Sequence, residues 1–108
     1  MLKINQSKLF INENEYDFGI SIKTALEYDD IYVILLGDNE LFANNVLAID
    51  SFGRTLWKIN DILKIENPPA NTVIKKNGET ILAVLSSIGM LYEIDIKTKK
   101  LIKSTIMR

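Results

Sequence analysis

The fold-defining feature of this sequence is a repeat, VLAIDSFGRTLWKI at residues 46–59 and LYEIDIKTKKLIK at residues 91–103. In each copy an Ile-Asp pair ends an apolar run, at Asp50 and Asp95, and a Leu follows six positions after the Asp. Two apolar runs joined by a short polar turn are typical of a β-hairpin. The repeat therefore predicts two similar hairpins.

A continuous apolar run precedes each hairpin, at residues 31–36 and 81–85. Such runs suit strands that are covered on both faces. The Ile-Asp pairs are 45 positions apart (94 minus 49), and that spacing with four strands per unit is typical of a propeller blade. Two blades cannot close a ring. We therefore predict an all-β fold of two consecutive four-stranded antiparallel meanders, 24–59 and 71–107, blade-like and packed as a sandwich or partly open barrel.

The remaining local signals fill in this plan within one predicted domain, 1–108. Strands are predicted at 24–28, 31–36, 46–50, 55–59, 71–76, 80–86, 90–95 and 100–107, with further candidates at 2–5, 8–11 and 16–22. One short helix is predicted over 60–66, because Pro68 and Pro69 would stop it. The first repeat turn contains Gly53, whereas the second contains no glycine, so we expect a strained residue or a different turn there.

Composition restricts the chemistry. The chain of 108 residues has no cysteine and no histidine, which removes thiolates, imidazole bases and the usual zinc ligands. We therefore expect a protein that is not an enzyme, with no catalytic residues, no metal and no cofactor. The longest aliphatic or aromatic run, 31–36, is far short of the about 20 residues that span a membrane. We expect a soluble, cytoplasmic protein without a signal peptide.

Acidic side chains are concentrated in one part of the chain. Between residues 13 and 40 there are eight acids and one base, Lys23, whereas 62–108 has four acids and eight bases. The acids are Glu13, Glu15, Asp17, Glu27, Asp29, Asp30, Asp38 and Glu40. Such a segment is either a solvated face or a surface that recognises a basic protein, because complementary charge speeds encounter and sets specificity. We take these residues as candidate partner-binding residues.

Several single features allow more than one interpretation. Asp29 and Asp30 could hold a hard cation, but a two-residue hairpin loop explains them better. Trp57 is expected in the core, with an interface anchor as the alternative. Phe52 lies at a turn apex, so we add it to the partner-binding candidates.

The last hairpin is basic, with lysines at 97, 99, 100 and 103. Nucleic-acid binding would favour interleaved aromatic residues and a positive domain. This run contains no aromatic residue, and the chain has a net charge of −1. We therefore expect no nucleic acid as a partner.

The chain resembles short bacterial blade-like β proteins found as immunity proteins of contact-dependent inhibition and other polymorphic toxin systems. The residues that carry the resemblance are 29–36, 46–59, 89–95 and 98–101. Where members of that group carry Thr-Gly-Lys in the last turn, this chain has Thr98-Lys99-Lys100. The resemblance implies a cognate toxin domain as partner, often a basic ribonuclease, bound so that its active site is covered.

Our leading hypothesis from sequence is therefore a cytoplasmic immunity protein, monomeric or homodimeric. The alternative is a non-enzymatic β-sheet binding or self-assembling module with another ligand. A toxin gene beside the gene for this chain would favour the first, and self-association in solution would favour the second.

Overall fold

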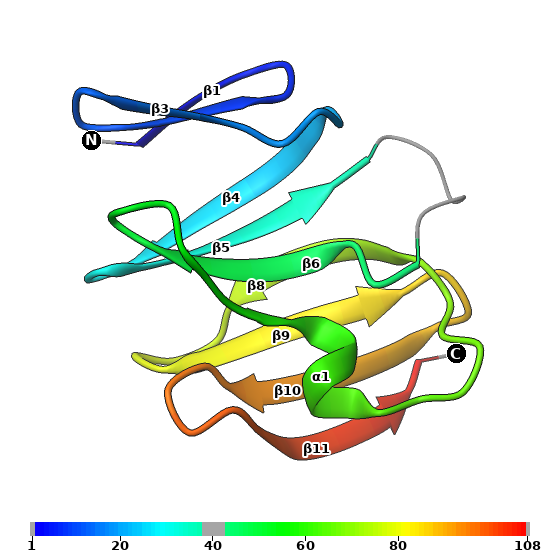
Figure 1. Ribbon diagram of the computed structural model, residues 1–108. Coiled ribbons are helices and arrows are strands. Elements are labelled where there is room, and N and C mark those ends of the chain that lie inside the picture. Colours follow the sequence, from blue (N-terminus) through cyan, green and yellow to red (C-terminus); the bar gives the residue numbers. More distant parts are fainter. Residues whose placement is uncertain (1, 38–42, 108) are drawn as a thin grey trace.

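The computed structural model describes residues 2–37 and 43–107, and its regular secondary structure is β-strand apart from one short helix (Figure 1). Every strand pairs antiparallel with its neighbour in sequence within one of three sheets, and no sheet of the described strands closes into a barrel. The N-terminal sheet contains β1 (Leu2–Asn5), β2 (Lys8–Ile11) and β3 (Asn14–Asp17). The middle sheet contains β4 (Ile22–Tyr28), β5 (Ile31–Leu36), β6 (Val46–Asp50) and β7 (Thr55–Lys58). The C-terminal sheet contains β8 (Asn71–Lys76), β9 (Ile81–Ser86), β10 (Met90–Asp95) and β11 (Lys100–Ile106). The all-β prediction is confirmed.

The N-terminal sheet differs from the prediction in its third strand. A strand was expected at 16–22, but β3 ends at Asp17. The Asp17 carboxylate accepts hydrogen bonds from the Ser7 hydroxyl (2.8 Å) and from the Gly19 N–H (2.9 Å). Gly19 has a φ of 74°, a conformation that suits glycine in a turn. The chain therefore turns here and re-enters a strand only at Ile22.

The middle sheet lies between the other two sheets. One of its faces packs against Leu9 and Ile11 of β2, and the opposite face shares a core with the C-terminal sheet. Residues 32–35 of β5 are all buried, so the prediction of a strand covered on both faces is confirmed there. It is wrong for 81–85, where burial alternates and only Leu82 and Val84 are buried. No further layer of the described chain covers the outer face of β9.

The one described helix, α1 (Ile59–Leu63), is shorter than the predicted 60–66. It begins where Asp61 accepts a hydrogen bond from the Lys58 N–H (3.0 Å). It ends at Lys64, whose φ of 52° is left-handed, and the Asn60 side chain bonds both the N–H and the carbonyl of Ile65. The side chain of Asn60 thus ends the helix before the prolines do. This helix is too short to cross a membrane, and the described residues contain no other.

Both repeat turns contain a residue in the left-handed conformation, but only the first uses glycine for it. The Asp50 carboxylate accepts the N–H groups of Phe52 and Arg54, and the Asp95 carboxylate accepts those of Lys97 and Thr98. The first turn places Gly53 in the left-handed region at a φ of 84°. The second places Lys99 there, at 59°. The expectation that a non-glycine residue accepts strain in the second turn is confirmed.

Polar side chains join the middle and C-terminal sheets. The buried Asn45 amide donates to the carbonyls of Leu36 and Asn71, and its oxygen accepts from Asn71. At the neighbouring edges of β4 and β8, Lys23 donates to the Thr72 carbonyl (2.7 Å) and Lys76 to that of Glu27 (2.9 Å).

Candidate protein-binding surface

Five tight turns lie at the same end of the molecule, on the left of Figure 1. They connect β2 to β3, β4 to β5, β6 to β7, β8 to β9 and β10 to β11. We call this the hairpin end, and it comprises residues 12–13, 29–30, 51–54, 77–80 and 96–99. Turns held by a rigid sheet scaffold commonly carry binding residues. Several of the residues predicted from sequence to bind a partner lie here.

Two carboxylates and two tyrosines gather at the upper part of this end. Glu27 lies opposite Tyr32 in the β4–β5 pair. Burial raises the pKa of the Tyr32 phenol, and the charges of Glu27 and Asp30, together with Tyr16, raise it further. Both carboxylates are exposed, while Tyr32 is only 6% exposed. The negative charges of Glu27 and Asp30 therefore lie at the surface, next to the buried ring of Tyr32.

Phe52 projects from the adjoining β6–β7 turn. Its side chain is 74% exposed, the largest value among the exposed large hydrophobic residues described. Arg54 lies over its ring at 5.3 Å from the centroid, and Arg54 also donates to the Asp50 carboxylate at 2.8 Å. Burial works against ionisation of Asp50, but hydrogen bonds from Arg54 and Phe52 outweigh it and hold its pKa below the usual value.

Tyr16 links the N-terminal sheet to this turn. Its hydroxyl donates to the carbonyl of Ser51 (2.9 Å). A Cβ placed on Gly53 would clash with the Tyr16 ring. Glycine is therefore required at 53 for two reasons, its left-handed φ and the ring that lies against it. The turn that carries Phe52 is consequently held in place by β3.

The structure brings together only part of the predicted acidic surface. Glu13, Glu27, Asp30 and Phe52 are exposed at or beside the hairpin end. Asp17 lies at the opposite end of β3, where hydrogen bonds from Gly19 and Ser7 lower its pKa. Glu15 and Asp17 alternate with the inward-facing Tyr16, so they lie on the outer face of the N-terminal sheet.

Four further members of the predicted set have other placements. Glu15 pairs with Lys8 at 3.5 Å. Asp29 lies in a charged hollow discussed below. Asp38 and Glu40 are outside the described residues. The described members of the predicted set therefore do not form one continuous face, because Glu15 and Asp17 lie along β3 and away from the turns.

Asp29 faces lysines from the C-terminal sheet. It borders a hollow of about 300 Å³ between the two four-stranded sheets, lined by Tyr28, Asp29, Lys76, Glu79, Thr80 and Lys97. Lys76 lies 4.7 Å from the centre of the Tyr28 ring. Burial raises the pKa of Tyr28 to about 12, and its hydroxyl donates to the Ile81 carbonyl at 2.7 Å. The acidic and basic parts of the sequence therefore meet here instead of forming separate poles.

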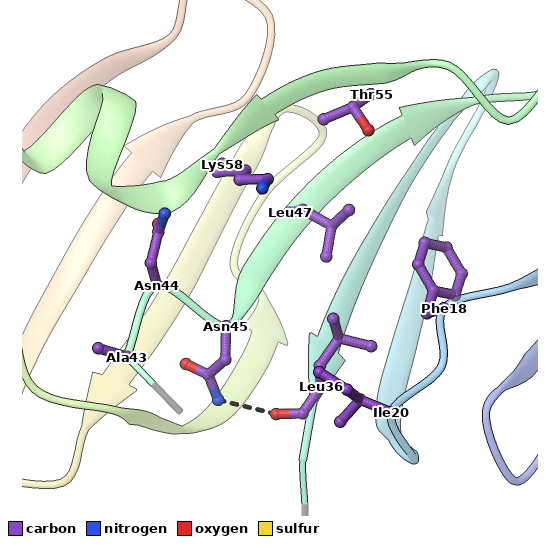
Figure 2. Close-up of a pocket in the computed structure, with 9 residues that line it drawn as sticks. All are labelled: Phe18, Ile20, Leu36, Ala43, Asn44, Asn45, Leu47, Thr55 and Lys58. Atoms are coloured by element: carbon purple, nitrogen blue, oxygen red, sulfur yellow. Dashed lines mark hydrogen bonds between the residues drawn. The ribbon is translucent and has the colours of Figure 1, made fainter. Parts of the chain in front are cut away.

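A second, mainly apolar cleft lies toward the opposite end of β5 (Figure 2). It has a volume of about 380 Å³. Its walls are Phe18, Ile20, Leu36, Ala43, Asn44, Asn45, Leu47, Thr55 and Lys58. Sequence reasoning missed this cleft, because its walls come from four separate segments. It also missed Tyr16 and Tyr32, which have no motif and are brought together only by packing of β3 on β5.

The fold and the turn-borne surface define an all-β protein with a candidate protein-contact site. The chain belongs to the family described as Domain of unknown function (DUF7957), whose family model matches residues 1–106. A search among curated proteins gives no match.

Proposed function

We propose that this protein is a bacterial immunity protein that binds a cognate toxin and neutralises it by covering its active site. The proposed partner is a basic nuclease domain in the cytoplasm. The observation that carries the proposal is the exposed Phe52 of the β6–β7 turn, at the same hairpin end as the exposed Asp30 of the β4–β5 turn and the exposed Glu27 of β4. It agrees with the resemblance of residues 29–36 and 46–59 to immunity proteins.

The chemistry of this surface suits such a partner. Exposed aromatic side chains are common anchors of protein interfaces. A nuclease site is basic because it receives phosphate, so carboxylates around the anchor would steer it. Glu13 and Asp30 lie on turns, and Glu27 extends the negative charge along β4.

The anchor is also rigid before binding. Asp50 accepts two turn N–H groups and the Arg54 guanidinium, and Tyr16 holds the same turn through Ser51. Ordering a mobile loop on binding costs free energy, so a preformed turn gives higher affinity.

The proposal includes the way the two meanders are packed. Their shared core contains Val33, Val46 and Trp57 of the middle unit with Leu82 and Ile94 of the C-terminal one. This supports blade-like sheets packed face to face, as a sandwich and not as a partly open barrel. Face-to-face packing is what brings the turns of both units to one end.

The test uses the toxin domain encoded beside the gene for this chain. Glu27→Lys with Asp30→Lys should slow association by about tenfold at low salt, with a smaller effect at high salt, because surface charges are screened. Phe52→Ala should mainly speed dissociation, since it removes a desolvated anchor. Both can be measured by stopped-flow or surface plasmon resonance at two salt concentrations.

A matched control has the same net charge as the Glu27/Asp30 double variant. Glu15→Lys with Glu66→Lys makes the identical charge change on exposed residues outside the five turns, Glu15 on the outer face of the N-terminal sheet and Glu66 beyond α1, and it should leave association close to wild type. Equal slowing by both double variants would contradict a localised acidic surface. Binding unaffected by Phe52→Ala and by the Glu27/Asp30 pair would overturn the proposed site, and absence of any binding would overturn the proposed function.

A further inference from the structure

The free edge of β11 is unlike the other sheet edges of the described chain. Strands β1, β3 and β7 have four residues each. The edges of β4 and β8 lie beside each other and are joined by Lys23 and Lys76. β11 has seven residues and pairs only with β10. Natural proteins normally shorten, cover or charge an exposed edge, because its unpaired N–H and C=O groups are a template for another strand. β11 carries charge only in its first half, at Lys100 and Lys103, and residues 104–107 are uncharged.

β11 also carries a large share of the exposed apolar side chains. Leu101, Ile102, Ile106 and Met107 are between 42% and 61% exposed. Ile88, which is 68% exposed, lies in the β9–β10 turn near Met107, since Met107 donates its N–H to the Gly89 carbonyl (2.7 Å). Exposed apolar residues gathered on one element mark an interaction site.

The register of β10 and β11 shows which groups point outward. The N–H of Met107 points toward β10. Because N–H directions alternate along an antiparallel strand, the N–H of Thr105 also points to β10, and those of Ser104 and Ile106 point to the free edge. The register shift in this pair lies before Lys103, so the alternation holds from Lys103 onward.

We infer that β11 pairs antiparallel with β11 of a second copy of this chain, with the two Ser104 residues opposite each other. This surface is additional to the hairpin end. In this register Ile106 and Met107 of each copy lie against the part of β11 that carries Leu101 and Ile102 of the other copy, next to the register shift. Lys103 lies opposite Thr105, so no like charges lie opposite each other between Lys103 and Thr105. The outward N–H groups make Ser104 a hydrogen-bonded pair, and a two-fold axis through it is the commonest symmetry of protein dimers.

The neighbouring register, centred on Lys103, fits less well. It would place two lysines opposite each other, which destabilises a sheet. A strand from a different protein would best fit this edge if it carried carboxylates opposite Lys100 and Lys103. Self-pairing does not depend on such carboxylates, because Lys103 lies opposite Thr105.

The absence of cysteine makes a crosslinking test specific. Across a hydrogen-bonded antiparallel pair the Cα atoms are about 5.5 Å apart, within the range a disulfide bridges. Ser104→Cys should therefore form a covalent dimer under mild oxidation. In the same register two Lys103→Cys residues would lie roughly 8 Å apart, beyond that range, and this variant is the matched control because both residues are exposed.

Sedimentation equilibrium of the full chain tests the dimer directly. The wild type should approach twice the 12.3 kDa chain mass over about a hundredfold rise in concentration. Ser104→Pro removes one outward N–H donor from each copy, two in the dimer, and keeps the hydrogen bonds to β10. It should weaken dimerisation by about tenfold or more. Ile106→Lys should do the same, whereas Val73→Lys on β8, also exposed, should not.

The outcomes separate cleanly. A wild type that stays monomeric throughout overturns the inference, as does a dimer that Ser104→Pro and Ile106→Lys leave intact. Crosslinking of Lys103→Cys as fast as Ser104→Cys would overturn the register. Binding of the toxin tested for the hairpin end is a separate measurement, so loss of one proposal does not remove the other.

Discussion

The middle and C-terminal sheets are built from similar sequences but occupy different environments. β5 is buried on both faces because β2 covers one face and β9 and β10 cover the other. β9 is its counterpart, yet Ala83 and Leu85 are only partly buried. An apolar run in the sequence therefore predicts a strand. Whether one or both faces of that strand are covered depends on how many sheets pack against it.

The largest effect should follow from Trp57, which joins the two sheets. Its side chain is 3% exposed, and its indole N–H donates to the Ile96 carbonyl (3.2 Å). Trp57→Ala should lower the free energy of unfolding by about 3–5 kcal/mol, since it leaves a cavity and an unpaired carbonyl. Chemical denaturation measures this. A loss below about 1 kcal/mol would contradict a core shared by the two sheets.

A paired substitution compares the two apolar runs directly. Ile34, in β5, is completely buried, so Ile34→Ala should cost about 2–5 kcal/mol. Leu85, in β9, is partly buried on the outer face, so Leu85→Ala should cost about 1 kcal/mol. Equal losses in urea unfolding would show that the outer face of β9 is covered in solution.

The polar connection between the sheets should have an intermediate effect. Asn45→Ala removes the amide that bonds Leu36 and Asn71 and leaves buried groups unpaired. We expect a loss of about 1–3 kcal/mol. Asn14→Ala is the control, because Asn14 is exposed on β3. If both variants unfold at the same denaturant concentration, the Asn45–Asn71 pair does not hold the sheets together.

The repeat turns allow a stabilising change. Lys99 is the left-handed residue of the second turn, as Gly53 is of the first, although Lys99 follows its Asp by four positions and Gly53 by three. A side chain in this conformation costs roughly 1–2 kcal/mol of strain. Lys99→Gly relieves it but adds flexibility to the unfolded chain, so we expect a net gain of about 0.5–1 kcal/mol. Gly53→Ala is the reciprocal change and should destabilise strongly because of Tyr16. A lower melting temperature for Lys99→Gly would contradict this account.

The smallest effect concerns acid stability of the same turns. Hydrogen bonds to Asp95, from Thr98 first, lower its pKa, and those to Asp50 do so despite its burial. A carboxylate with a lowered folded-state pKa contributes stability above its unfolded value of 3.8, and that contribution is lost as the pH falls through the folded value. Asp50→Asn and Asp95→Asn should therefore flatten the loss of stability below about pH 4. Unfolding curves from pH 2 to pH 7 whose slopes match the wild type would exclude this role for the turns.

The strands of the repeat could be predicted closely because turn residues bound each apolar run. The runs at 31–36, 46–50 and 71–76 end at Asp, Gly or Asn. The N-terminal sheet was harder to predict. Its strands have four residues, and its turns use Gln6 and Asn12 at positive φ instead of glycine. The three-layer arrangement follows from that sheet, so it too was absent from the prediction.

The candidate site could be predicted only in part. Phe52 was found because a phenylalanine at a turn apex conflicts with the usual polarity of turns. The charge around Asp29 could not be found, because Lys76 and Lys97 are far away in sequence and come close only when the sheets stack. Counting charges along the sequence places Asp29 in an acidic segment and Lys76 and Lys97 in a basic one, whereas the fold brings all three to the same hollow.

The contact between Tyr16 and the turn at Gly53 has a consequence for cooperativity. The N-terminal sheet is small and is the natural unit to open first, because its short strands contribute few buried side chains. Its opening withdraws the ring that lies on Gly53 and the hydroxyl that holds Ser51. A molecule with this sheet detached therefore presents Phe52 on a loosened loop. Conversely, a partner that binds the β6–β7 turn and holds it closed should slow amide hydrogen exchange in β1 to β3. Exchange in the first strands therefore reports whether a partner is bound at this turn.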